Sequence, residues 1–148
     1  MAGLVRFGIS MEGPLAARFD RLIAGRGYPN RSEAIRDLVR RELVRQEWQD
    51  PQAEIVGTVT LVYDHHVREL GERLVALQHE HHDQVISTTH VHLTHDHCLE
   101  VLVVRGRAAQ VRKLADRLIA ARGVLHGEVV ATTTGKVFEK SGRHKHAH

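Results

Sequence analysis

A cluster of residues that bind metal ions marks the second half of the chain. The stretch THVHLTHDHC, residues 89–98, holds four histidines and the only cysteine of the 148 residues. Side chains two positions apart on a strand point to the same face, so His90 and His92 can chelate one ion. Cys98 follows a tight turn and returns beside them as a thiolate ligand. Two imidazoles and one thiolate leave a coordination position for water or for a residue from elsewhere.

Further histidines surround this cluster, and all thirteen in the chain lie after Val62. Imidazole with thiolate suits zinc, copper, cobalt and nickel; planar geometry would favour nickel(II) or copper(II), and tetrahedral geometry zinc. Tyr63 and Glu100 are candidates for hydrogen bonds that orient a ligating imidazole. Other histidines can be secondary metal ligands or ordinary solvated residues: His65, His81, His82, His95 and His97.

The cluster needs a sheet to position it. Alternating and amphipathic patterns predict strands at 55–64, 85–93, 98–106 and 124–134, with helices at 66–83 and 108–123. This order is the split-βαβ arrangement, with both helices on one face of the sheet. Residues 135–148 have the composition of a basic, histidine-rich tail without ordered structure.

The first fifty residues differ from the rest, with nine arginines, no lysine and no histidine. Alternation over residues 4–11 predicts a strand whose apolar side chains share one face. Two helices follow. Pro14 fits the start of the first and Gly27 its end, while Asn30 and Glu33 suit a capping box that begins the second. So small a unit buries too little surface to be stable alone, so we expect its strand to pair with that of a second chain.

Composition indicates what kind of partner the protein binds and in which compartment it is located. The sequence pI is about 9.4 with a formal charge of +3, a mild indication of an anionic partner. A single cysteine suits a reducing cytoplasm. The beginning of the chain has no secretory pattern, and no apolar run approaches the roughly 20 residues that a membrane span needs. We therefore expect a cytoplasmic protein without a membrane segment.

Two stretches resemble known families. RGYPNRSEAIRDLVR, after a short arginine-bearing strand, resembles ribbon-helix-helix DNA-binding proteins. QHEHHD followed by THVHLTHDHCLEVLVVRG resembles the metal-binding domain of the NikR family of nickel-responsive repressors. The resemblance spans Arg6 to Thr133. It implies an α+β protein with an N-terminal ribbon-helix-helix domain (βαα, dimeric) at 1–48 and a linker at 49–54. A βαββαβ ferredoxin-like or ACT-type domain, which binds metal and forms the tetramer, would follow at 55–134, before the tail at 135–148.

The resemblance also implies a metal and an assembly. Nickel(II) would bind His90, His92 and Cys98, and His79 from a neighbouring subunit would complete a planar four-coordinate site. The protein would be a homotetramer, a dimer of dimers. The family further implies a second cation between the domains, bound by Glu33 and Asp37. These two residues lie four apart on one helix face, where a solvated acidic pair is an equal alternative.

Double-stranded DNA is the implied partner. A two-stranded ribbon fits the major groove, where the outward side chains of Arg6, Gly8 and Ser10 would meet the bases. Arg6 can bond guanine, whereas Ser10 specifies weakly and Gly8 stands where the family has a hydroxyl residue, so the operator sequence stays open. The start of the second helix would bind phosphates through Asn30, Arg31 and Ser32.

These observations predict a nickel-responsive repressor that binds a palindromic operator, by resemblance that of nickel-uptake genes. Two alternatives remain: a sensor of zinc or copper with the same architecture, and a metal storage or delivery protein. An enzyme is not expected, because no general base stands beside the cluster. A site closed by four protein ligands also leaves no room for a small organic substrate.

Overall fold

The structure is a computed structural model that describes residues 3–67 and 69–138. The described residues form two compact units, one of residues 3–43 together with Phe138 and one over Val44–Val137, and the division falls within a helix. The predicted linker, residues 49–54, contains the last residue of that helix and a turn. None of the helices in the described ranges is long and apolar enough to cross a membrane.

The first unit contains two helices whose ends follow from local sequence. Helix α1 (Gly13–Gly25) has Pro14 in its first turn. Gly27 adopts a φ of 77°, and the N–H of Tyr28 then bonds the carbonyl oxygen of Ile23 at 3.0 Å, a turn that ends the helix. Helix α2 (Arg31–Gln49) begins where Asn30 Oδ1 accepts the N–H of Glu33 at 2.9 Å. The predicted helix cap at Asn30 is therefore confirmed.

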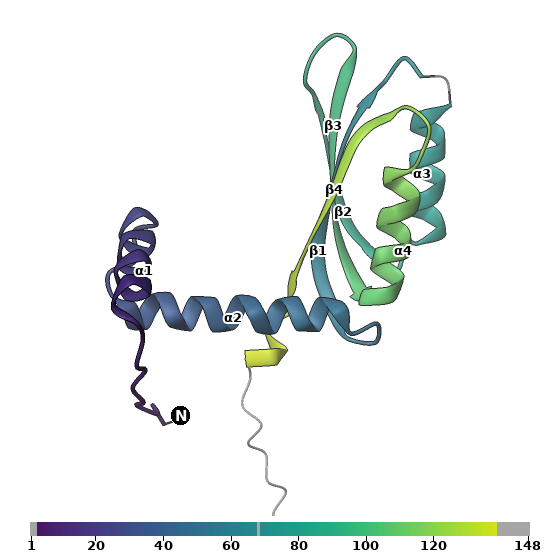
Figure 1. Ribbon diagram of the computed structural model, residues 1–148. Helices are drawn as coiled ribbons and strands as arrows, with labels where there is room; N and C mark the ends of the chain where they lie inside the picture. The colour runs from purple at the N-terminus through teal and green to yellow at the C-terminus, as the bar shows by residue number, and fades with distance from the viewer. Residues whose placement is uncertain (1–2, 68, 139–148) are drawn as a thin grey trace, which may run out of the picture. The chain divides into compact units, whose positions relative to one another are not determined.

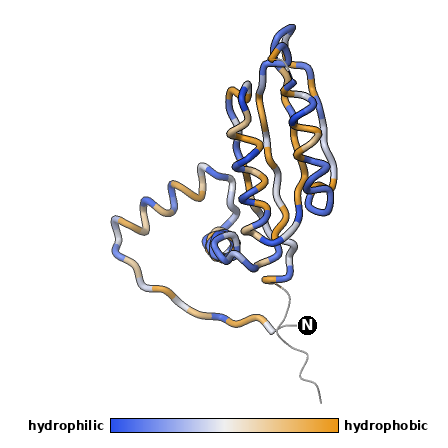
Figure 2. Tube along the Cα trace, turned by 90° about the vertical axis from the view of Figure 1, so that its right-hand side faces the viewer, coloured by the Kyte–Doolittle hydropathy of each residue, from blue (hydrophilic) through white to orange (hydrophobic). Residues whose placement is uncertain are grey.

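The strand predicted over residues 4–11 is not formed in the single chain. Residues 3–12 contain no strand or helix, and the apolar side chains of this segment are exposed. Figure 2 shows the alternation of hydrophobic residues, in orange, with polar ones along this part of the trace. The exposed apolar residues are Leu4, Val5, Phe7, Ile9 and Met11. A strand needs a hydrogen-bonding neighbour and a cover for its apolar face. The described part of this chain supplies neither to the segment.

The second unit is a four-stranded antiparallel sheet with two helices on one face (Figure 1). Its elements follow the predicted βαββαβ order: β1 (Glu54–Asp64), α3 (Leu70–Glu80), β2 (Val85–His92), β3 (His97–Arg107), α4 (Ala108–Ile119) and β4 (Val124–Thr133). The strands are arranged β2-β3-β1-β4, so the longest strands, β1 and β3, lie in the centre. The hairpin of β2 and β3 is thus one edge of the sheet.

The core lies between this sheet and its helices. Alternate residues of β1 are buried, as the period of two predicts. The largest fully buried side chains of the unit come from β1, β3, α3 and α4: Ile55, Leu61, Leu74, Leu102, Leu114 and Leu118. Each such leucine or isoleucine contributes about 1.5–3 kcal/mol by leaving water. This burial makes the sheet a rigid support for side chains at its end.

Several predicted boundaries were wrong. Helix α3 starts at Leu70 rather than at 66, because residues 65–67 form a turn and Glu69 has a left-handed φ of 69°. The helix ends at Glu80, so His81 and His82 lie in the turn that follows it. His97 is the first residue of β3 and not part of the connecting turn.

Helix α4 and the tail also differ from the prediction. Helix α4 ends at Ile119, and Gly123, with a φ of 97°, belongs to the turn that leads into β4. Lys136–Phe138 form a short 3₁₀ helix, so this part of the predicted tail is ordered. The rest of the tail, residues 139–148, lies outside the described residues.

Candidate metal centre

The β2–β3 hairpin brings three metal-type donors together. The strand register pairs His92 with Cys98 and His90 with Glu100, which places both histidines on the face that carries the Cys98 thiol. Nδ1 of His92 lies 3.4 Å from Sγ of Cys98, and the donor atoms of His90, His92 and Cys98 all lie within 4.8 Å of one another. Neighbouring nitrogen and sulfur ligands of one ion are about 3–3.5 Å apart. The donor set therefore fits a late transition-metal ion.

The three donor residues differ in their exposure to solvent. The Cys98 thiol is fully buried, whereas both imidazoles are exposed on the edge strand. The fourth residue of the predicted set, His79, lies exposed on the last turn of α3 and outside the group of three donors. Among the described residues of this chain the centre is thus a three-donor site that opens outward.

Of the two residues proposed to orient an imidazole, Tyr63 contacts His90 directly and Glu100 is bonded to Tyr63. The Tyr63 hydroxyl donates to Glu100 Oε2 at 3.1 Å and lies 3.1 Å from His90 Nδ1. A phenol has one proton, so His90 Nδ1–H must donate to Tyr63, which leaves the other ring nitrogen free to bind a metal ion. Burial, and then the charge of Glu100, raise the pKa of Tyr63 above its ordinary value, so the hydroxyl keeps its proton.

Gln78 is a contributor that the sequence analysis missed. Its side-chain N–H donates to Glu100 Oε1 at 2.7 Å, and the Thr88 hydroxyl donates to Gln78 Oε1 at 3.0 Å. Helix α3 is thereby hydrogen-bonded to the group that orients His90. Gln78 is four residues after the buried Leu74, which points it toward the sheet, but this spacing alone does not distinguish it from a surface glutamine.

The remaining histidines have different surroundings. His65 Nδ1 lies 3.7 Å from Cys98 Sγ, close to the centre. His97 Nδ1 lies 3.5 Å from the Thr94 hydroxyl. His81 contacts Arg117, and His82 contacts the carbonyl of His79. His95 lies beside His66 and Asp96, two residues that the sequence analysis did not include.

The acidic pair predicted for a second cation has partners within the chain. Glu33 pairs with Arg36 at 2.7 Å, and Asp37 pairs with Arg41 at 3.1 Å and accepts the Tyr28 hydroxyl. Both carboxylates are thus neutralised by neighbouring arginines. A cation would have to compete with these guanidinium groups.

The residues predicted to contact DNA lie in the first unit. Arg6, Gly8 and Ser10 are exposed on the segment before α1. Arg31 makes two bonds of 2.8 Å with the carboxylate of Asp20, and this hydrogen bonding lowers the pKa of Asp20. Ser32 is exposed beside it. At the start of α2 the N–H of Glu33 is thus already capped by Asn30, and Arg31 is held by Asp20.

Comparison with known proteins identifies the family. Residues 56–132 match the family described as the NikR C terminal nickel binding domain. The chain belongs to the NikR family. Residues 5–46 match the copG family of ribbon-helix-helix proteins, which is the other half of the NikR arrangement. The predicted α+β fold class and nickel as the bound metal are confirmed.

Named relatives agree with this assignment. The chain is 59% identical over 111 residues to a protein of Solibacter usitatus (strain Ellin6076), covering 75% of this chain and 80% of the relative. It is 56% identical, with the same coverage, to a protein of Geobacter metallireducens. Both are nickel-responsive regulators by name. The NikR chain is accordingly a nickel-binding, DNA-binding regulator and not an enzyme.

Proposed function

We propose that this NikR protein is a repressor that binds its operator when nickel(II) occupies a planar site. His90, His92 and Cys98 would supply three ligands, and His79 of the partner subunit the fourth. The observation that carries the proposal is the pairing of His92 with Cys98 on one hairpin, with His90 within reach of the same point. The thiolate that the site requires is compatible with the reducing cytoplasm, where we place the protein.

The exposure of this donor group supports a ligand from a second chain. The imidazoles of His90 and His92 are open to the outside, and His79 is exposed and outside the group of its own chain. An ion that joins His79 to another chain's hairpin would link metal binding to assembly. Its binding energy would then favour one arrangement of the oligomer.

Two apolar surfaces support a homotetramer. Residues 4–11 expose an apolar face that a paired ribbon would cover. The sheet face opposite the helices exposes Val91 by 41% and Val130 by 60%. We propose that ribbons pair chains into dimers and that this sheet face helps to pair dimers into a tetramer.

DNA recognition would use two segments of the first unit, the ribbon and the start of α2. In the paired ribbon, Arg6 and Ser10 would address base edges, with Gly8 allowing close approach. Asn30, Arg31 and Ser32 would hold phosphates at the start of α2. Two ribbons on one tetramer match a palindromic operator, and we propose that its genes are those of nickel uptake. DNA must then tighten nickel binding by the same factor by which nickel tightens DNA binding.

A second cation at Glu33 and Asp37 is a lesser part of the proposal. The two carboxylates are four residues apart on α2 and so share a face. The ion would replace Arg36 and Arg41 as their partners. It would stabilise the DNA-bound form by freeing those two arginines.

A DNA-binding titration tests the proposal. Nickel, zinc and copper are titrated separately, at fixed salt, against a promoter fragment of nickel-uptake genes from the protein's own genome. We expect tight binding with nickel, lost in Cys98→Ala and His79→Ala and kept in the control His126→Ala. An equal response to all three metals would leave open which metal is the signal, and a stronger response to zinc or copper would support a sensor of that metal. Binding indifferent to metal would contradict the switch and support a storage role for the histidines.

Mixed oligomers test the shared site. Cys98→Ala and His79→Ala chains each lack a complete site when alone. Assembled together, the His79 of a Cys98→Ala chain can complete the site on a His79→Ala chain. We expect the nickel–thiolate absorbance in the near ultraviolet to return only in the mixture. Failure to return would contradict a ligand from the partner subunit.

A further inference from the structure

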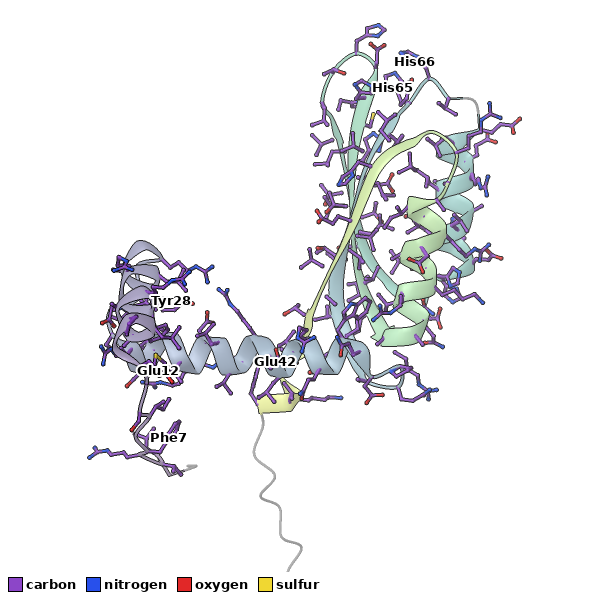
Figure 3. The ribbon with its side chains drawn as sticks, in the orientation of Figure 1. Phe7, Glu12, Tyr28, Glu42, His65 and His66 are labelled. Carbon is purple, nitrogen blue, oxygen red and sulfur yellow. The ribbon has the colours of Figure 1, made fainter. Side chains whose placement is uncertain are left out.

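Two turns meet at the end of the sheet beyond the metal centre. One turn follows β1 and contains His65 and His66 (Figure 3). The other joins β2 to β3 and contains His95 and Asp96. The backbone N–H of His65 donates to the carbonyl oxygen of Asp96 at 3.1 Å, which fastens the turns together.

Three donors from these turns converge on one point. Nε2 of His66 lies 2.9 Å from Oδ1 of Asp96, and Nδ1 of His95 lies 3.1 Å from the same oxygen. The donor atoms of all three residues lie within 4.8 Å of one another. Two nitrogen ligands of one ion are at most about 4 Å apart, so movements below about 1 Å would close the group around an ion.

The local hydrogen bonds hold these donors in place. The Thr94 hydroxyl accepts the N–H of Asp96 at 3.2 Å and that of His97 at 3.1 Å. Asp64 Oδ1 accepts the N–H of His66 at 2.9 Å. Both imidazoles contact the same oxygen of the Asp96 carboxylate. The group therefore presents one anionic and two imidazole donors on fixed turns.

We propose that His66, His95 and Asp96 form a second metal site, which binds one divalent late first-row transition-metal ion per chain. Two imidazoles and a carboxylate suit zinc, copper and nickel. The affinity of an exposed site for these metals follows their general order. The side chains of His66, His95 and Asp96 are 51%, 87% and 59% exposed, so water completes the coordination and the ion exchanges readily.

This site shares no donor with the centre at His90, His92 and Cys98. His65 lies between the two groups, with its ring 4.1 Å from that of His66 and 6.3 Å from that of His92. Each group contains its own anionic ligand, a thiolate in one and a carboxylate in the other. The two ions can therefore be bound and counted separately.

Nickel binding to the full-length chain tests the site with two readouts. His144, His146 and His148 are replaced by alanine in every protein, so that these histidines add no ligands. Equilibrium dialysis with metal analysis gives the total nickel bound, and the near-ultraviolet thiolate band gives occupancy of the Cys98 centre. We expect His66→Ala/His95→Ala to bind one ion fewer per chain than the parent while the thiolate band is unchanged. At the nickel concentration that half-fills the parent's second site, Asp96→Asn should lose most of the half ion per chain that this site then holds.

A matched control removes the same number of histidines elsewhere, the half-buried His81 and the exposed His82. His81→Ala/His82→Ala should keep the full number of ions, because these residues are not part of either donor group. Equal nickel binding by the parent and His66→Ala/His95→Ala would overturn the proposal, as would an equal loss in the control. Loss of the thiolate band in His66→Ala/His95→Ala would also overturn it, because the sites would not be separate. Absence of that band in the parent would instead contradict the proposed nickel centre and leave the count at the second site intact.

Discussion

The hydroxyl of Tyr63 lies 3.1 Å from Nδ1 of His90, and its proton is directed to Glu100. This relationship fixes which nitrogen of His90 carries hydrogen and holds the ring in place. Groups that orient a metal ligand in this way commonly change metal affinity by about 10–100-fold when removed.

Tyr63→Phe should therefore weaken nickel binding by at least about ten-fold without unfolding the protein. The phenyl ring keeps the buried packing, while His90 loses the acceptor of its N–H. Competition with a chelator of known affinity gives the change. Tyr28→Phe, which removes a hydroxyl bonded to Asp37 in the other unit, is the control and should leave nickel affinity unchanged. Equal affinity in Tyr63→Phe and the parent would contradict the role of this hydroxyl.

Alkaline pH provides a second measure of the Tyr63 environment. Burial and the charge of Glu100 raise the pKa of Tyr63 in the folded protein. The contribution of Tyr63 to the free energy of unfolding is therefore complete below the pKa of an unfolded tyrosine, about 10, and is lost as pH rises through the pKa in the folded protein. We expect the free energy of unfolding in urea to fall above about pH 10, and to fall less in Tyr63→Phe. The same pH dependence in both proteins would argue against a raised pKa at this residue.

Asp20 should limit DNA binding because it holds Arg31. Asp20→Asn would free the guanidinium for a phosphate, and we expect tighter DNA binding with a salt dependence steeper by about one phosphate contact per bound chain. Fluorescence anisotropy over a range of salt concentrations measures both. Asp116→Asn removes the same charge from the other unit and serves as the control. If both variants change the salt dependence equally, the effect is one of net charge and not of Arg31.

The end of α1 should depend on Gly27. Its φ of 77° disfavours any residue with a Cβ, so Gly27→Ala should destabilise the first unit by about 1–2 kcal/mol. Gly25→Ala, in the last turn of the same helix and with open space around the added Cβ, should be neutral or slightly stabilising. Thermal unfolding followed by circular dichroism compares them. A smaller loss for Gly27→Ala than for Gly25→Ala would contradict this account of the turn.

The sequence predicted those parts of the site that depend on a regular period. Alternation along β2 placed His90 and His92 on one face, and the short hairpin returned Cys98 beside them. Tyr63 and Glu100 were predicted only as candidates to orient an imidazole, and the structure shows that both are buried. Asn30 could be predicted as a helix cap because only a few residue types are preferred at that position.

Other contributors depended on contacts between distant segments. His66 and Asp96 meet only because the turns after β1 and β2 lie at the same end of the sheet, and no period links residues 30 apart. Helix α3 began later than predicted because the apolar spacing continues through the turn, where Val67 still packs against the core. The strand at residues 4–11 depends on a neighbour that the single chain does not contain.

Because the segment before α1 is exposed in a single chain, the number of paired DNA-binding heads depends steeply on the total concentration of chains. In the dimer proposed above, each DNA-binding head needs two chains, so when chains are scarce the number of heads grows with their square. Halving synthesis would then remove more than half of the heads. A solitary chain presents an open, unstructured stretch of the kind that proteases cut readily, so degradation would remove unpaired chains first and sharpen the threshold.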